Sequence, residues 1–101
     1  MKAHEIATKV AGLVGGDREH THGSKLENFS KIATLWQAYL EIRRDPVRPL
    51  GPDDVGYMMA LMKVARTQHG AYNPDDDLDL VGYGACVAEV SAALNAPSAP
   101  T

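Results

Sequence analysis

The segment from Lys25 to Arg43 constrains the fold most, because its apolar residues recur every three or four positions. Polar and charged side chains occupy the other side of the same stretch. This spacing is typical of an amphipathic helix that buries one face. Ser24 precedes the segment as a helix cap, and Glu27 completes a capping box three residues later. The residues predicted to face the core are Leu26, Phe29, Ile32, Ala33, Trp36, Tyr39 and Leu40.

Three further helices are expected, from about Lys2 to Val14, from Pro52 to about Gln68, and from a start near residues 75–77 to about Leu94. Prolines and glycines separate these segments, and proline cannot continue a helix. The chain has one Phe and one Trp, so aliphatic helix packing is favoured over a β-sandwich. We therefore predict an all-α fold, a compact four-helix assembly in which residues 1–94 form one domain and residues 95–101 form a disordered tail.

Composition excludes several classes of protein. A formal net charge of −3 argues against bulk nucleic-acid binding and against an anionic membrane as the main partner. No apolar run reaches the roughly 18 residues of a membrane span. The single cysteine, Cys86, allows no intrachain disulfide and is expected in the core. A cytoplasmic protein is the default expectation, and homo-oligomerisation is expected because short helices bury limited area alone.

Two charged residues interrupt the apolar pattern of the segment from Pro52 to Gln68. On a helical wheel Arg66 falls over Val55 and Met62, and Lys63 lies at the edge of the same stripe. A charge directed at a core is costly unless it is paired. Arg66 is therefore expected either to reach solvent or form a structural ion pair, or to bind a ligand.

The last predicted helix begins with a run of aspartates. Asp75 and Asp79 are four residues apart, so they lie on one face, which continues through small residues such as Gly82. Asp76 and Asp77 diverge from that face and are predicted to point to water. The acids either favour the positive end of the helix or, if Asp75 and Asp79 point inward, bind Mg²⁺ or pair with the basic residues of the preceding helix.

The spaced pattern of the chain resembles a family of short phage and prophage proteins, a domain of unknown function. The resemblance covers about residues 15–90. The residues that carry it are Gly16-Asp17-Arg18, His22-Gly23, Asn28-Phe29, Ile32-Ala33, Leu35-Trp36, Tyr39-Leu40, Asp54-Val55, Met58-Met59, Lys63, Ala65-Arg66, Asp75, Asp79 and Gly82-Tyr83.

More distantly, this family is similar to the all-α nucleoside triphosphate pyrophosphohydrolases, the MazG and dUTPase-like group. That resemblance implies helix-borne acids, in Glu-x-x-Glu and Glu-x-x-Asp motifs, that hold Mg²⁺ against a triphosphate. Asp76 and Asp79 have the spacing of the second motif, with Asp in place of Glu. The first motif is missing, which leaves a fully ligated metal site short of carboxylates.

The first functional hypothesis is therefore a Mg²⁺-dependent, nucleotide-directed protein of this pyrophosphohydrolase type. Asp54, Asp75 and Asp79 are the predicted metal ligands. Lys63 and Arg66 would hold phosphates, and two further residues would touch base or sugar. The predicted nucleotide-binding residues are His22, Asn28, Lys63 and Arg66.

Two alternatives remain open from the sequence. The protein could bind and sequester a nucleotide or cyclic dinucleotide without catalysis, which requires the basic residues but not a full metal shell. It could also be a structural interaction module, in which Arg66 and the Asp75 and Asp79 pair form an ion-pair cluster that fixes the helix register.

Overall fold

The computed structural model describes residues 2–5, 8 and 24–97, and all regular structure in this part of the chain is helical. Residues 3–5 and 8 are helical, and the described chain from residue 24 onward forms three helices: α3 (Lys25–Ile42), α4 (Pro52–Thr67) and α5 (Pro74–Leu94). Their bounds agree with the predicted segments to within one residue, except that α5 begins at Pro74, one to three residues before its predicted start. Most of the predicted helix from Lys2 to Val14, and residues 98–101 of the predicted tail, lie outside the described residues.

Local side chains explain where the helices start. The Ser24 hydroxyl accepts a hydrogen bond from the backbone N–H of Glu27 at the start of α3. The Asn73 side chain accepts one from the N–H of Asp75 at the start of α5. Pro52 and Pro74 occupy the first turns of α4 and α5, where the missing N–H costs nothing. The predicted Ser24 cap of α3 and the predicted start of α4 at Pro52 are thus observed.

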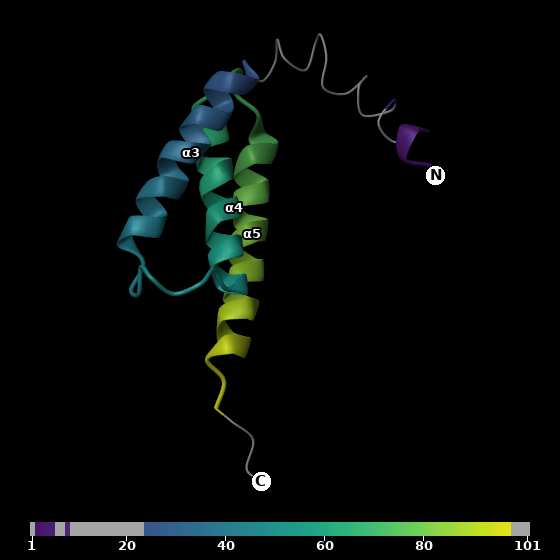
Figure 1. Cartoon of the computed structure of the whole chain (residues 1–101). Helices are drawn as coiled ribbons and strands as arrows, with labels where there is room; N and C mark the ends of the chain where they lie inside the picture. Colours follow the sequence, from purple (N-terminus) through teal and green to yellow (C-terminus); the bar gives the residue numbers. More distant parts are fainter. Residues whose placement is uncertain (1, 6–7, 9–23, 98–101) are drawn as a thin grey trace.

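Helix α4 lies between the other two helices, packing against α3 on one side and along α5 on the other (Figure 1). Helices α4 and α5 approach each other closely at Gly56, where a Cβ atom would come within 2.2 Å of Cγ2 of Val87. Trp36 joins α3 to α4 by donating from Nε1 to the carbonyl oxygen of Met58 at 2.6 Å. Both α3 and α5 therefore contact α4 around residues 56–58.

The core within the described residues is small. Its buried apolar residues are Ile32, Ala65 and Val87, one from each helix. Several residues predicted for the core are instead exposed: Leu26 is 78% exposed and Phe29 is 66% exposed. Both lie in the first turns of α3, and periodicity marks an apolar face without showing whether another element covers it.

The prediction for α5 chose the wrong face. The face of α5 that is turned toward α4 carries Asp76, Tyr83 and Val87. Gly82 and Cys86, which belong to the predicted packing face, are exposed. Small and apolar residues occur on nearly every side of α5, so their spacing does not define one packing face. Among the described residues, no helix is both long and apolar enough to cross a membrane.

Candidate functional site

Four charged side chains meet where the end of α4 passes the start of α5. Lys63 Nζ lies 2.8 Å from Oδ2 of Asp79 and 3.8 Å from Oδ1 of Asp76. Arg66 Nε lies 3.6 Å from the same Oδ1 of Asp76. We call these four residues, Lys63, Arg66, Asp76 and Asp79, the α4–α5 charge cluster. It is formally neutral, with two cations from α4 and two carboxylates from α5.

Helix geometry explains how the cluster forms. Lys63 and Arg66 are three residues apart on α4, and Asp76 and Asp79 are three apart on α5, so each pair shares a face. A short connector reverses the chain between the helices (Figure 1), which brings the end of α4 against the beginning of α5. The two pairs therefore face each other across the helix contact.

Burial differs within the cluster. The Asp76 side chain is 6% exposed and that of Lys63 13%, whereas that of Asp79 is 50% exposed. A nearly buried carboxylate is tolerated here because two cations lie beside it. Asp79 lies at the solvent edge, so one carboxylate of the cluster is accessible from outside while the other is held within the helix contact.

The same end of α4 is held to α3 by a polar contact. Lys31 Nζ donates to the carbonyl oxygen of Gln68 at 2.9 Å and lies 3.1 Å from Nδ1 of His69. His69 is buried, and its Nε2 lies 3.0 Å from the carbonyl oxygen of Ser24. Asn28 lies between Ser24 and Lys31 on this face of α3 and is 7% exposed. Its Oδ1 is buried and has no hydrogen-bond partner.

The structure brings three of the predicted site residues together, because Lys63, Arg66 and Asp79 are in contact through the cluster. Asn28 is buried on α3, which packs on the other side of α4 from α5. His22 lies outside the described residues. The remaining two predicted residues, Asp54 and Asp75, are placed elsewhere.

Asp75 and Asp76 exchange the roles that the sequence predicted for them. Asp75 is exposed and its backbone N–H bonds to Asn73, whereas Asp76, expected to point to water, is 4% exposed. The reason is the face of α5 that packs on α4, which is rotated by one residue from the predicted face. The sequence prediction named Asp75, although the Asp-x-x-Asp spacing of Asp76 and Asp79 was a signal for the pair that contacts Lys63.

Asp54 lies at the opposite end of α4, nine residues before Lys63 and thus about 13 Å away along the helix axis. The structure does not bring it together with Asp75 and Asp79. Its side chain is 1% exposed, and both carboxylate oxygens accept hydrogen bonds. The donors are the Tyr39 hydroxyl at 2.6 Å, the Gly51 N–H at 2.8 Å, Arg48 Nη2 at 2.9 Å and Arg43 Nη1 at 3.4 Å.

These contacts set the ionisation of the groups around Asp54. The Gly51 N–H, followed by the Tyr39 hydroxyl, holds the pKa of the Asp54 carboxyl below its usual range against the opposing effect of burial. Burial, followed by the hydrogen bond to Asp54, raises the pKa of the Tyr39 hydroxyl. The ionised Asp54 carboxylate of α4 is therefore hydrogen-bonded both to α3 and to the connector between α3 and α4.

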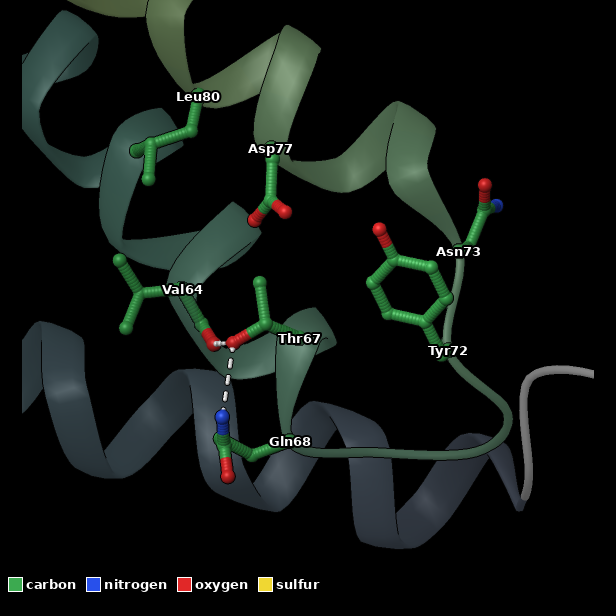
Figure 2. Close-up of a pocket in the computed structure, with 7 residues that line it drawn as sticks. All are labelled: Val64, Thr67, Gln68, Tyr72, Asn73, Asp77 and Leu80. Atoms are coloured by element: carbon green, nitrogen blue, oxygen red, sulfur yellow. Dashed lines mark hydrogen bonds between the residues drawn. The ribbon is translucent and has the colours of Figure 1, made fainter.

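A separate pocket of about 380 Å³ opens beside the connector from α4 to α5 (Figure 2). Tyr72 and Asn73 border it from the connector, and Asp77 and Leu80 border it from α5. Thr67 lines the pocket from α4, and its hydroxyl donates a hydrogen bond to the Val64 carbonyl oxygen at 2.6 Å (Figure 2). None of the predicted site residues lines this pocket.

The comparisons with known proteins define the family. Residues 5–91 match the family described as Domain of unknown function (DUF6378). The chain belongs to this family. It is also similar to two phage proteins, each named "Gene 55 protein": 33% identical over 88 residues to that of Mycobacterium phage D29, and 37% identical over 78 residues to that of Mycobacterium phage L5.

The matches cover most of this chain but only part of each relative. They span 87% of this chain and 54% of the D29 protein, and 77% of this chain and 47% of the L5 protein. The chain therefore spans about half the length of these curated relatives. No solved structure matches. The predicted membership of a phage family of unknown function is confirmed.

The described residues contain no group of three or more His, Cys, Asp or Glu side chains placed to hold a metal ion. A smaller donor set is present at the cluster, where Asp76 and Asp79 both contact Lys63. Two carboxylates suit Mg²⁺, which usually keeps several waters and takes its other ligands from substrate phosphates. The residues present therefore fit a Mg²⁺ ion that arrives with a phosphorylated ligand.

Proposed function

We propose that this phage-family protein binds a nucleoside triphosphate together with Mg²⁺ at the α4–α5 charge cluster. One observation carries the proposal: Lys63 Nζ lies between the carboxylates of Asp76 and Asp79, with Arg66 on the other side of Asp76. Two cations and two carboxylates in one place match the two halves of a magnesium–phosphate complex. The resemblance to all-α pyrophosphohydrolases points to the same class of ligand.

The cations supply the contacts to phosphate. Lys63 and Arg66 carry their charges on the same face of α4, and their side chains are 13% and 21% exposed. Charge-assisted hydrogen bonds from such groups to phosphate are about twice as strong as neutral ones. Arg66 can bind two oxygens at once through its planar fork, while Lys63 acts as a point charge.

The exposed carboxylate of the cluster, that of Asp79, supplies the contact to the metal. Mg²⁺ would add the charge that lets two acids and a triphosphate share one site. Asp79 is half-exposed, so its carboxylate can leave Lys63 and turn to a metal without disturbing the helix contact. Lys63 is then released to a phosphate. Asp76 remains next to Arg66 and fixes the position of the guanidinium.

Asn28 provides a polar group for the rest of the nucleotide. Its Oδ1 is buried without a partner at the same end of α4, and buried polar atoms are nearly always satisfied. A ligand N–H or hydroxyl donor would satisfy this oxygen. We assign Asn28 to the base or sugar.

Calorimetric titration of the full chain with ribo- and deoxynucleoside triphosphates and cyclic dinucleotides, with and without Mg²⁺, tests the proposal. Lys63→Met removes the charge and retains the aliphatic stem, and Lys25→Met is its control at an exposed position of α3. We expect at least one triphosphate to bind only with Mg²⁺, and Lys63→Met to weaken that binding roughly tenfold or more. Absence of binding, or equal losses in the two variants, would refute the proposal.

A second pair of variants tests the metal. Asp79→Asn removes a carboxylate of the cluster, whereas Asp77→Asn removes an exposed one that lies two residues away on α5. Asp79→Asn should abolish the dependence of binding on Mg²⁺, and Asp77→Asn should leave it intact. Release of pyrophosphate from the bound nucleotide, by attack of water on the α-phosphorus, would identify a hydrolase. Binding without release would identify a sequestering protein.

Self-association is a second candidate, favoured by the outer face of α5. Leu78 and Val81 are 67% and 71% exposed, and three exposed alanines continue the same face at spacings of three and four. Such spacing is typical of a helix that packs against another helix. The alanines are Ala85, Ala88 and Ala92.

Sedimentation measurements distinguish this candidate. Val81→Glu places a charge on the outer face of α5, and Val47→Glu places one on the connector, where Val47 is 91% exposed. If a homo-oligomer uses α5, Val81→Glu should dissociate it and Val47→Glu should not. A monomer at all concentrations, or an oligomer insensitive to Val81→Glu, would exclude this face.

A further inference from the structure

A second pocket, of about 410 Å³, lies at the opposite end of α4 from the charge cluster. The end of α3, the connector to α4, the start of α4 and the last turns of α5 all contribute to it. This volume is within the range of small-molecule sites. Its lining residues are Tyr39, Ile42, Arg43, Arg44, Asp45, Arg48, Asp53, Asp54, Tyr57, Ser91 and Asn95. We call it the arginine pocket.

Two lining residues carry buried polar atoms that lack a partner. The Arg43 side chain is 8% exposed and its Nε is buried without an acceptor. The Ser91 hydroxyl oxygen, from the far side of the pocket on α5, is also buried without a partner. Leaving such a group unmet costs about 1–3 kcal/mol, more for a charged one. Both Arg43 Nε and Ser91 Oγ can donate a hydrogen bond to an oxygen of a ligand that binds between α3 and α5.

The rest of the Arg43 guanidinium is already fixed. Nη1 lies 3.4 Å from Oδ2 of Asp54, and Nη2 donates to the carbonyl oxygens of Pro46 and Arg48 at 3.0 and 2.8 Å. These bonds hold the guanidinium rigidly, so a ligand need not order it. A rigid donor with one unused N–H is suited to an incoming anion.

The other two arginines of the pocket stand at its solvent side. Arg48 is 48% exposed, although Nη2 pairs with Asp54 at 2.9 Å. Arg44 is exposed and makes no hydrogen bond or ion pair with any described residue. Arg44 is therefore the cation of the pocket that is available to a ligand.

The aspartates of the pocket are engaged by the protein. Asp54 accepts from four donors, and Asp53 Oδ1 accepts from the N–H of Asp54 at 3.0 Å. Asp45 Oδ1 accepts from the N–H of Val47 at 3.2 Å. These bonds engage both oxygens of Asp54 and one oxygen each of Asp53 and Asp45, whereas the buried atoms without a partner belong to Arg43 and Ser91.

We propose that the arginine pocket binds a small phosphomonoester, with Arg44 and Arg48 at its mouth and Arg43 Nε and Ser91 Oγ contacting phosphate oxygens inside. The rings of Tyr39 and Tyr57, whose centroids are 6.1 Å apart at an interplanar angle of 44°, supply an aromatic wall for the organic part of the ligand. The site shares no residue with the charge cluster, so its ligand binds independently of the nucleotide proposed above.

Titrations of the full chain with inorganic phosphate, phenyl phosphate and benzoate, each followed by calorimetry, test this site. We expect phenyl phosphate to bind more tightly than inorganic phosphate, because only phenyl phosphate contacts the tyrosines. Arg44→Gln should weaken phenyl phosphate binding roughly tenfold. Lys25→Gln, which makes the same change of charge on α3, should not weaken it.

Two further variants show whether phenyl phosphate occupies the arginine pocket or the charge cluster. Ser91→Ala removes an unpartnered buried hydroxyl, so it should retain the fold and still weaken binding. Lys63→Met should leave phenyl phosphate binding unchanged. Tighter binding of benzoate than of phenyl phosphate, no binding of any probe, equal losses in Arg44→Gln and Lys25→Gln, or loss in Lys63→Met would each overturn the proposal.

Discussion

Gly56 lies at a close approach of α4 and α5, and replacing it with alanine tests that packing. The added Cβ would lie 2.2 Å from Cγ2 of Val87, 3.4 Å from its Cβ and 3.7 Å from its Cα. Relief of the first distance requires a shift of more than about 1 Å by a side chain that is itself buried, or by α5. Overpacking of this kind costs about 1–3 kcal/mol. The gain in helix propensity from Gly to Ala offsets about 1 kcal/mol of that cost.

Gly82 provides the matched control, because it also lies inside a helix but a Cβ there meets nothing within 4 Å. Gly82→Ala should raise the free energy of unfolding by about 0.5–1 kcal/mol. Gly56→Ala should be less stable than Gly82→Ala by about 1–3 kcal/mol, the cost of the clash. Urea denaturation followed by circular dichroism measures both values.

The double variant identifies the atom responsible. Val87→Ala alone should destabilise the protein by about 2 kcal/mol, since it removes a buried side chain. In Gly56→Ala/Val87→Ala the close contact disappears and the new methyl group fills part of the cavity, so the double variant should be more stable than additivity predicts by about 1 kcal/mol or more. Equal stabilities of Gly56→Ala and Gly82→Ala, together with additive effects, would refute the close packing of α4 on α5 at Val87.

Three shorter predictions concern other contacts. The pKa of Asp54 is lowered in the folded state. Its contribution to stability should therefore be complete above its unfolded pKa of about 3.9 and be lost as the pH falls through its folded pKa. Asp54→Asn should flatten the acid limb of a stability–pH profile. Trp36→Phe should lose the bond to the Met58 carbonyl and about 1 kcal/mol of stability in urea denaturation, and an unchanged midpoint would contradict it. Ser24→Ala should cost about 1 kcal/mol through loss of the cap, and Ser24→Gly only a few tenths, as measured by thermal unfolding.

Helix positions were predictable because they depend on local signals. Ser24 and Pro52 set the starts of α3 and α4 by capping and by backbone restriction, which act within one turn. The charged positions at the end of α4 were also visible, because Lys63 and Arg66 interrupt an apolar stripe. Their pairing with α5 follows from the short connector between the helices.

The sequence did not show which face of α5 packs against α4. For the same reason it did not show whether Asp75 or Asp76 would be buried. Small apolar residues surround this helix, so α4 decides which side is covered. The tie around Asp54 was missed for another reason. It depends on Tyr39 of α3, which reaches Asp54 only when α3 folds back onto α4, and on Arg48 of the connector, six residues before Asp54. The three-residue spacing of Gly51 and Asp54, a capping-box distance, is the local signal that could have identified this carboxylate as structural.

The central claim is that a magnesium–nucleotide complex binds where α4 ends and α5 begins. Amide ¹H–¹⁵N NMR spectra of the full chain, recorded during a titration with a magnesium–triphosphate complex, test it directly. We predict that the largest shifts map to Asn28, Lys63, Arg66, Asp76 and Asp79, while the amides around Asp54 stay unchanged. Spectra that do not change, or shifts confined to the Asp54 end of α4, would contradict the claim.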